Sequence, residues 1–236
     1  MNFTIIRVLK SIFIKLKLHV IFKPFAGIFL QIVYMTRLSK WADENRNVKV
    51  NDFYSKWDYN KRFGLYKQVI DDENLSTPIN YLEFGVADGY SFNWWMTQNV
   101  NAASSFYGFD TFTGLPEDFG PYKKGTFNSG KIPEIKDNRG KFYQGLFQQT
   151  LPDFLKQFLN DKRKVIMLDA DLYSATLFVL TSLAPFLNSG DIVLFDEFVV
   201  PTHEFMAYQN FIDSFYIKME LIAAANNYYF VAFKVS

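Results

Sequence analysis

Three carboxylates stand at the ends of two predicted strands. Asp169 ends the hydrophobic run 165–169, and Asp196 and Glu197 directly follow the run 191–195. Because the carboxyl ends of neighbouring parallel strands meet at one edge of a sheet, we expect the three acids to lie close together. Carboxylates that close repel one another unless a proton or a cation lies between them, and Mg²⁺ prefers such oxygen ligands. The acids are therefore predicted to hold a divalent metal; for any single acid, the alternative is a helix cap or a surface ion pair.

A glycine-containing turn follows an earlier predicted strand. Residues 83–91 have the spacing E-x-G-x-x-x-G, in which Gly85 and Gly89 allow the backbone to turn sharply and approach a ligand at a helix N-terminus. This spacing differs from the G-x-G-x-x-G of dinucleotide-binding folds, and the glycines could equally serve the turn alone. Asp110 ends the next predicted strand, where a carboxylate can accept both hydroxyls of an adenosine ribose or cap a helix.

Short hydrophobic strands alternate with helical stretches from residue 79 onward. The predicted strands are 79–86, 104–110, 141–147, 165–169, 191–195, 215–223 and 228–235. The predicted helices are 92–100, 151–159, 174–187 and 203–214. Such alternation is typical of an α/β, doubly wound and mostly parallel sheet. We divide the chain into a basic arm (1–42), a leading helical segment (43–78) and the α/β domain (79–236).

Residues 111–139 form a long connection rich in glycine, proline and polar residues. Connections of this length in compact domains are commonly lids or binding loops. The alternative is a disordered surface insertion.

The composition excludes several classes of site. Of the 236 residues, 49% are hydrophobic and 21% charged, which favours a folded domain over disorder. The chain has no cysteine, which excludes disulfides, thiolate metal sites and cysteine nucleophiles. Its only histidines, His19 and His203, cannot form a histidine-rich metal centre, so a metal would need mainly oxygen ligands.

The net charge of +1 is the sum of two unlike parts. Residues 1–42 contain seven Lys and Arg and no acid, whereas the remainder has 18 basic and 24 acidic residues and a net charge of −6. Hydrophobic residues in 5–20 recur at helical spacing, which predicts a basic amphipathic helix. Lys15, Lys17, Lys23 and Pro24 interrupt the arm, so it is not a typical membrane span. The arm is expected to pack on the body or a second subunit, or to bind a membrane surface; its charge is too sparse for nucleic acid.

Four separated motifs together resemble class I S-adenosylmethionine-dependent methyltransferases. They are YLEFGVADGYS (81–91), YGFDTFTGLPEDF (107–119), GLFQQTLPDFL (145–155) and the segment 165–198 with VIMLDADLYSAT and GDIVLFDEF. The set is similar to the macrocin O-methyltransferase family, which methylates sugar hydroxyls with a divalent metal, and EFGVADGYS also resembles the first motif of catechol O-methyltransferase. The resemblance covers residues 79–220 and implies a Rossmann-like, seven-stranded methyltransferase sheet behind an N-terminal helical extension.

The resemblance also implies roles for individual residues. Those implied to bind S-adenosylmethionine are Glu83, Gly85, Val86, Asp88, Gly89, Tyr90, Ser91, Asp110, Thr111 and Phe147. Asp169, Asp196 and Glu197 would hold Mg²⁺ or a similar ion, although the family usually has Asp-Asp or Asp-Asn where this chain has Asp196-Glu197.

The predicted reaction is methyl transfer to a sugar hydroxyl of a glycan or glycosylated metabolite. Asp169 is the first candidate for the general base, and His203, just beyond the fifth predicted strand, is the second. The rival functions are a catalytically silent, membrane-peripheral scaffold with a methyltransferase-like fold and a nucleotide-dependent oxidoreductase. We expect a cytoplasmic protein, peripheral at the inner face of the membrane or homodimeric through its arm, that binds a small-molecule or glycan acceptor and no nucleic acid.

Overall fold

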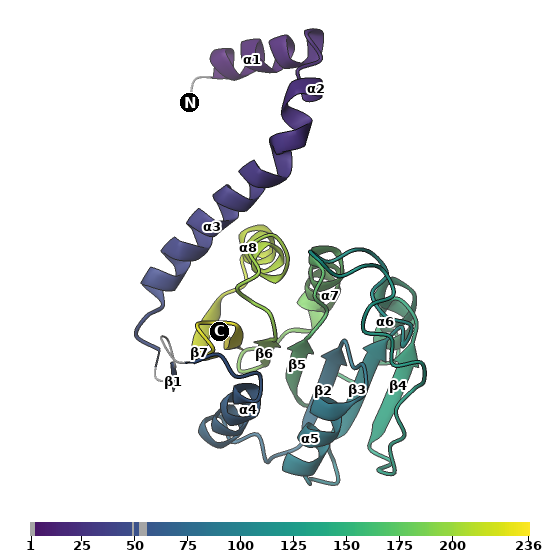
Figure 1. Cartoon of the computed structure of the whole chain (residues 1–236). Helices are drawn as coiled ribbons and strands as arrows, with labels where there is room; N and C mark the ends of the chain where they lie inside the picture. Colours follow the sequence, from purple (N-terminus) through teal and green to yellow (C-terminus); the bar gives the residue numbers. More distant parts are fainter. Residues whose placement is uncertain (1–2, 49, 52–55) are drawn as a thin grey trace.

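The computed structural model describes residues 3–48, 50–51 and 56–236. A single sheet runs through the α/β domain in the order β1-β7-β8-β6-β5-β2-β3-β4 (Figure 1). The strands are β1 (Val50–Asn51), β2 (Ile79–Phe84), β3 (Ser105–Asp110), β4 (Gly140–Gln144), β5 (Arg163–Leu168), β6 (Ile192–Phe195), β7 (Met219–Ala225) and β8 (Phe230–Val235). The seven predicted strands and the α/β fold class are confirmed, and the two-residue β1 extends one edge of the sheet.

The sheet is parallel except for β8, which runs antiparallel to both β6 and β7. The strand order reverses between β2 and β5, because the chain first builds outward through β3 and β4 and then returns to pair β5 with the other edge of β2. In open parallel sheets, ligands bind beyond the carboxyl ends of the strands at such a reversal. The topology therefore fixes where a site is expected.

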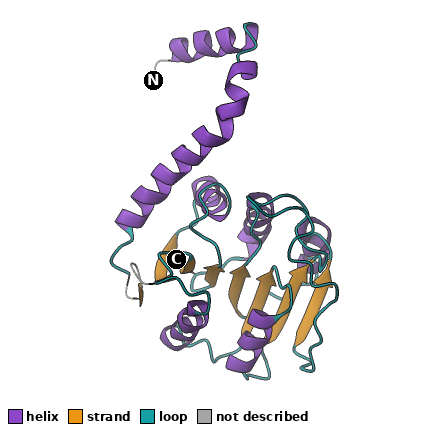
Figure 2. Cartoon of the chain, viewed as in Figure 1, coloured by secondary structure: helices purple, strands orange, loops and turns teal. Residues whose placement is uncertain are grey.

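Helices cover both faces of the sheet (Figure 2). They are α4 (Lys61–Asp72) and α5 (Tyr90–Gln98) on one face, and α6 (Phe147–Leu155), α7 (Tyr173–Leu183), the short η2 (Ala184–Phe186) and α8 (Glu204–Phe215) on the other. Alternate residues of a strand point to opposite faces, so Leu82 and Phe84 pack in the core under α6–α8 while Tyr81 packs in the core under α4 and α5. Burial on both faces explains the nearly continuous hydrophobic runs of these strands.

Two predicted strand boundaries are wrong, for local reasons. The strand predicted at 141–147 ends at Gln144, because Gly145 has a φ of +144° and Phe147 begins α6. The strand predicted at 215–223 begins only at Met219, because Phe215 ends α8 and Tyr216 caps that helix with a φ of +55°. Hydrophobic aromatic residues at a helix end gave the same pattern as a strand start.

The N-terminal arm is helical apart from a turn at residues 16–18 and projects from the domain (Figure 1). It comprises α1 (Phe3–Lys15), α2 (His19–Phe22), η1 (Lys23–Phe25) and α3 (Ala26–Glu44), and the chain bends between α1 and α2, where Lys17 has a φ of +50°. The helical stretch His19–Glu44 is long and apolar enough, by length and composition alone, to cross a membrane. Its C-terminal part instead packs on the domain, because Trp41 is buried against Phe198 and Tyr228.

Candidate active site

Strand register brings the predicted site residues level with one another. Phe84 pairs with Phe109 and with Leu168, and Leu168 pairs with Phe195. The residues that follow these partners are Gly85, Asp110, Asp169 and Asp196. All four therefore leave the sheet at the same edge, as predicted from the strand ends.

A cavity of about 520 Å³ lies at this edge. Residues from the ends of β2, β3, β5 and β6 line one side, and the connection 111–139 lines another through Gly114, Leu115, Tyr122 and Phe127. Among the residues implied to bind cofactor, Gly85, Asp110, Thr111 and Phe147 line the cavity, as do the predicted metal ligands Asp169 and Glu197. The connection 111–139 thus contributes to the cavity wall, and its Phe112, Leu115 and Phe119 are buried.

Gly85 is required by a close approach of two strands. Its φ is +94°, and a Cβ there would lie 1.7 Å from the carbonyl oxygen of Asp169. The turn that follows is held by Asp110, whose Oδ2 accepts the N–H groups of Val86 at 2.7 Å and Ala87 at 2.8 Å. Its Oδ1 accepts the N–H of Phe112 at 2.6 Å. A carboxylate has about four acceptor positions, so Asp110 retains capacity for ribose hydroxyls while it fixes the cavity floor.

Glu83 lies under the turn rather than along the cavity. It is fully buried, and it accepts hydrogen bonds from the hydroxyls of Ser91 and, at 2.6 Å, Tyr81. Burial raises the pKa of Glu83 to about 7, against the lowering effect of these two hydrogen bonds. In this arrangement Glu83 and Ser91 tie the start of α5 to β2.

The remaining turn residues are placed around the helix start. Gly89 caps α5 with a φ of +77°, and Val86 is buried. Asp88 and Tyr90 are exposed and outside the cavity lining. The assignment of Asp88, Gly89, Tyr90 and Ser91 to the cofactor therefore stays a prediction from the resemblance.

Asp196 faces an arginine. Its carboxylate accepts the hydroxyls of Tyr59 and Tyr66, both at 3.1 Å, and lies 3.4 Å from Nη1 of Arg62 on α4. The same Nη1 lies 3.7 Å from Oδ2 of Asp169. Asp196 is only 1% exposed, and burial raises its pKa against the lowering effect of Arg62. The guanidinium thus places a positive charge between the two acids, as their mutual repulsion requires.

Asp171 and Glu197 form a second acidic pair on the cavity wall. Glu197 accepts a hydrogen bond from the hydroxyl of Tyr229, and all three residues line the cavity. Burial, followed by the charge of Glu197, raises the pKa of Asp171 to about 8. Asp171 also has a φ of +57°, a conformation uncommon for a residue other than glycine. Strained residues with perturbed pKa values cluster at functional sites, so Asp171 joins the candidate site.

The predicted metal ligands do not converge as a three-carboxylate centre. Within the described residues, no group of three His, Asp or Glu side chains is arranged to hold a metal ion. Asp169 and Glu197 line the cavity, but Asp196 is turned to Arg62, Tyr59 and Tyr66. In this geometry a guanidinium takes the place that the sequence analysis gave to a divalent cation.

His203 and its neighbour Glu204 lie beside the site. His203 precedes α8, packs its ring 4.8 Å from that of Phe119, and accepts the Tyr173 N–H at 3.4 Å through Nδ1. It does not line the cavity, and burial lowers its pKa. Glu204 is fully buried, and its Oε2 accepts the Glu197 N–H at 3.1 Å. Burial, followed by the charge of Glu197, raises the pKa of Glu204.

Five residues of this site were not among the candidates predicted from the sequence. Tyr59, Arg62 and Tyr66 come from the segment before β2, which carries no recognisable motif, and Tyr229 comes from the turn into β8. The fifth, Asp171, could have been predicted, because it stands two residues after Asp169 at the end of the same strand.

Comparison with known proteins agrees with this geometry. Residues 82–198 match a family model described as a methyltransferase domain, and no curated protein sequence matches the chain. The solved structure of the calicheamicin methyltransferase CalS11 has 21% identity and a TM-score of 0.57, covering 86% of this chain and 91% of that one. An apo structure of CalS11, titled a TDP-rhamnose 3'-O-methyltransferase, has 22% identity and a TM-score of 0.53, covering 86% and 93%. The O-methyltransferase NovP has 19% identity and a TM-score of 0.57, covering 75% and 78%.

The sheet order, the glycine turn of β2 and the acid that ends β3 define a class I methyltransferase fold with a cavity at its strand reversal. Residues 82–198 thus match a methyltransferase domain, and the fold that contains them is the one shared with the methyltransferases CalS11 and NovP.

Proposed function

We propose that the protein transfers a methyl group from S-adenosylmethionine to a hydroxyl group of a sugar. The observation that carries this proposal is the cavity itself, which is lined both by the Gly85 turn with Asp110 and by the carboxylates Asp169, Asp171 and Glu197. The turn and Asp110 suit an adenosine with its ribose hydroxyls, and the carboxylates suit a polar acceptor that must lose a proton. CalS11, which has a similar fold, is named for transfer to a sugar, and this likeness supports a sugar as the acceptor.

The proposed reaction is an in-line displacement at the methyl carbon. A bond forms between the acceptor oxygen and the methyl carbon as the bond from that carbon to the sulfonium sulfur breaks, which leaves S-adenosylhomocysteine. The hydroxyl proton passes to a carboxylate that lines the cavity. Asp169 is the base predicted from the sequence, and Asp171 is an equally placed candidate, since both line the cavity. His203 would have to move to reach the acceptor.

Metal dependence remains a prediction from the sequence. A Mg²⁺ ion held by Asp169, Asp196 and Glu197 would require Asp196 to release Arg62, so we route no step through a metal. Activity measured after exhaustive chelation, and again after Mg²⁺ is restored, tests this point. Loss of activity in the chelator and its recovery with Mg²⁺ would support a metal in place of the Arg62 contact. Full activity in the chelator would contradict the metal prediction and leave Arg62 as the counter-ion of Asp169 and Asp196.

Calorimetric titration with S-adenosylmethionine tests the cofactor assignment. We expect wild-type protein to bind, and Asp110→Ala to bind at least tenfold more weakly, because the substitution removes the ribose acceptor and the anchor of the turn. Asp153→Ala, an exposed acid on α6, is the matched control and should bind as wild type does. Absence of binding by the wild type would contradict the proposed function.

Methyl transfer to a panel of nucleotide-linked and lipid-linked sugars then tests the acceptor class. Cofactor binding without transfer to any of them would favour the silent scaffold. Binding of a nicotinamide cofactor in preference to S-adenosylmethionine would favour an oxidoreductase, an alternative that the methyltransferase family match already disfavours. We place this activity in the cytoplasm, as the sequence analysis expects.

A further inference from the structure

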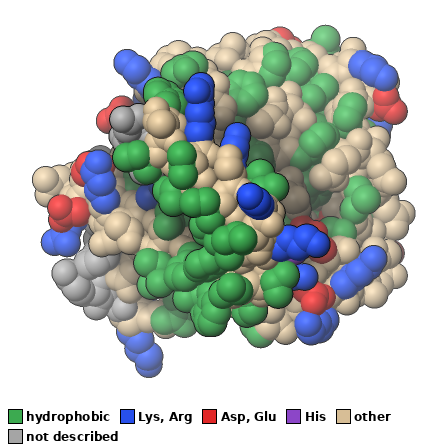
Figure 3. Space-filling view, turned by 90° about the horizontal axis from the view of Figure 1, so that it is seen from above, with side chains coloured by type: hydrophobic (Ala, Val, Ile, Leu, Met, Phe, Trp, Pro, Cys, Tyr) green, Lys and Arg blue, Asp and Glu red, His purple; other side chains and the backbone are tan. Residues whose placement is uncertain are grey.

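The outer part of the N-terminal arm, residues 3–30, exposes large hydrophobic side chains at a much higher density along the sequence than the other described residues do. Of the 29 large hydrophobic side chains that are exposed among the described residues, sixteen lie in this segment, including Leu9 (49% exposed), Ile14 (70%) and Val20 (68%). Soluble monomers rarely expose contiguous apolar surface on this scale without a partner. Figure 3, seen from the side of the arm, shows these side chains as a broad hydrophobic band with Lys and Arg beside it.

The charges on this surface all have one sign. Arg7, Lys10, Lys15, Lys17 and Lys23 are the ionised side chains of residues 3–30, and the sequence has no acid before Asp43. On α1 the polar residues Thr4, Arg7, Ser11 and Lys15 recur at intervals of three and four, so they share one face. Ile5, Leu9 and Ile12 recur at the same intervals on another face, which makes α1 a basic amphipathic helix.

The attachment of α3 to the domain limits how the arm can meet a membrane. From Gln31 onward α3 is held by the domain, because Gln31 accepts the hydroxyl of Thr202 at 3.1 Å and Tyr34 donates to Asn210 at 3.3 Å. The charge-free stretch 24–36 spans only about 20 Å as a helix, against about 30 Å of hydrocarbon core. An arm of this length and charge lies along an interface rather than crossing the bilayer.

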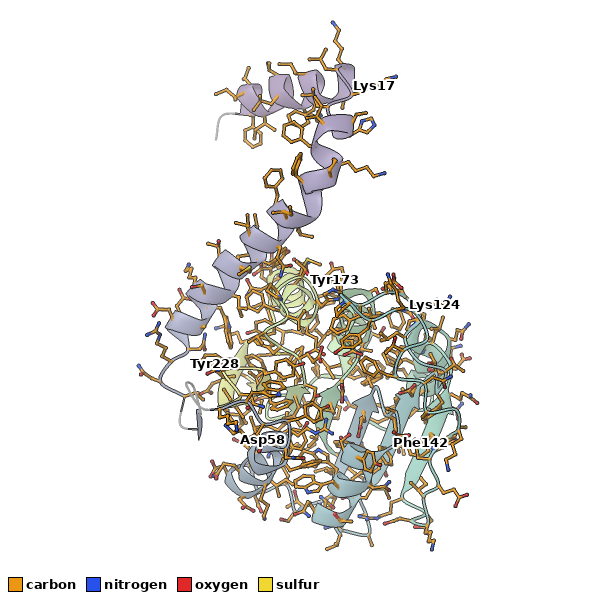
Figure 4. The ribbon with its side chains drawn as sticks, in the orientation of Figure 1. Lys17, Asp58, Lys124, Phe142, Tyr173 and Tyr228 are labelled. Atoms are coloured by element: carbon orange, nitrogen blue, oxygen red, sulfur yellow. The ribbon has the colours of Figure 1, made fainter. Side chains whose placement is uncertain are left out.

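We propose that residues 3–30 bind the surface of an anionic lipid bilayer, with α1 in the plane of the headgroups. The apolar face of α1 enters the acyl boundary, and the lysines pair with lipid phosphates, including Lys17, which Figure 4 shows at the outer corner of the arm. This proposal does not depend on the reaction assigned to the cavity.

A second copy of the chain is a weaker occupant for the same surface. A two-fold contact between arms brings the same patch of each subunit together. The five cations of one arm would then face the five cations of the other, with no acid in residues 3–30 to separate them. An anionic membrane offers both an apolar layer and the complementary charge.

Flotation of the full-length protein with lipid vesicles tests the proposal. We expect binding to vesicles that contain phosphatidylglycerol, weak binding to pure phosphatidylcholine, and release at high salt. Replacing Lys10 and Lys17 with Gln should weaken binding roughly 10- to 30-fold. The matched control replaces Lys136 and Lys156, two exposed lysines of the domain, and should change nothing.

A second pair of variants tests the hydrophobic contribution. Leu9→Asp with Val20→Asp should abolish binding, whereas Val100→Asp with Leu159→Asp, which alter even more exposed residues of the domain (79% and 73%), should not. Sedimentation velocity without lipid tests the competing explanation, a dimer formed through the arms. A stable dimer that Leu9→Asp dissociates, or vesicle binding that the arm variants leave intact, would overturn the proposal.

Discussion

Glu83 shows how one buried side chain makes stability depend on pH. Its pKa of about 7 in the folded protein exceeds the ordinary value of 4.5, so the folded state holds the proton more tightly than the unfolded chain does. The stability that this proton contributes is therefore complete below about pH 4.5 and is lost as the pH rises through about 7. The free energy of unfolding of the wild type should therefore fall as the pH rises. In Glu83→Gln, which mimics the protonated acid, we expect this fall to be smaller by about 2–4 kcal/mol.

Urea denaturation of both proteins at about pH 5 and about pH 8 measures this difference. Glu134→Gln, on the exposed part of the 111–139 connection, is the control and should retain the wild-type dependence. An equal fall in the free energy of unfolding for wild type and Glu83→Gln would show that Glu83 ionises normally in the fold.

Gly85 and Gly120 separate steric collision from backbone strain. Both have positive φ, but a Cβ at Gly85 would overlap the carbonyl oxygen of Asp169, whereas a Cβ at Gly120 meets nothing within 4 Å. We expect Gly85→Ala to lower the free energy of unfolding by at least ~3 kcal/mol, and Gly120→Ala to lower it by about 1 kcal/mol. Denaturant unfolding of both variants measures the two losses of free energy. Equal losses would show that a Cβ at position 85 does not collide with the Asp169 carbonyl.

At the scale of elements, α3 divides into a packed and an unpacked part. Trp41, on the packed part, lies among five aromatic rings of the domain: those of Phe198, Phe205, Tyr208, Tyr228 and Phe233. Figure 4 shows Tyr228 in the domain beneath the end of this helix, and its hydroxyl donates to the Asn45 carbonyl at 3.1 Å. The end of α3 thus belongs to the hydrophobic core.

Substitution of one aromatic residue on each part of α3 tests this division. We expect Trp41→Ala to cost about 3–5 kcal/mol of unfolding free energy, because it opens a cavity in the core. Phe29→Ala, on the same helix but 53% exposed, should change stability by less than about 0.5 kcal/mol. Similar costs for both would mean that the outer arm also packs on the domain.

At the scale of the whole molecule, the arm and the active-site edge lie on the same side of the sheet. Figure 1 shows the carboxyl ends of β2, β3 and β5 directed toward the side from which the arm projects. An arm bound to a lipid surface would therefore hold the cavity near that surface, an arrangement that suits a lipid-linked sugar.

Two truncations show which part of the arm the fold needs. Removal of residues 1–30 should leave the unfolding temperature unchanged, because the side chains of residues 3–30 are exposed except for the half-buried Leu18. Removal of residues 1–44 also deletes Tyr34 and Trp41, and should lower the unfolding temperature by about 10 °C. Differential scanning calorimetry distinguishes the two, and a large loss from the shorter truncation would contradict the exposed placement of the outer arm.

The sequence by itself determined the α/β, mostly parallel type of sheet, the glycine turn and the acids at the strand ends. These features are local, since hydrophobic runs, glycines and the residue that ends each strand are all read within a few positions, and the register of β2, β3, β5 and β6 then aligned Gly85, Asp110, Asp169 and Asp196. Only the tertiary structure decided what neutralises the acids. Arg62 and Tyr59 lie more than 100 positions before Asp196, and they meet it only because α4 packs on one face of the sheet with its N-terminal end near Asp196. Charge at a buried site depends on which side chains surround it in space, and that arrangement is a property of the folded chain.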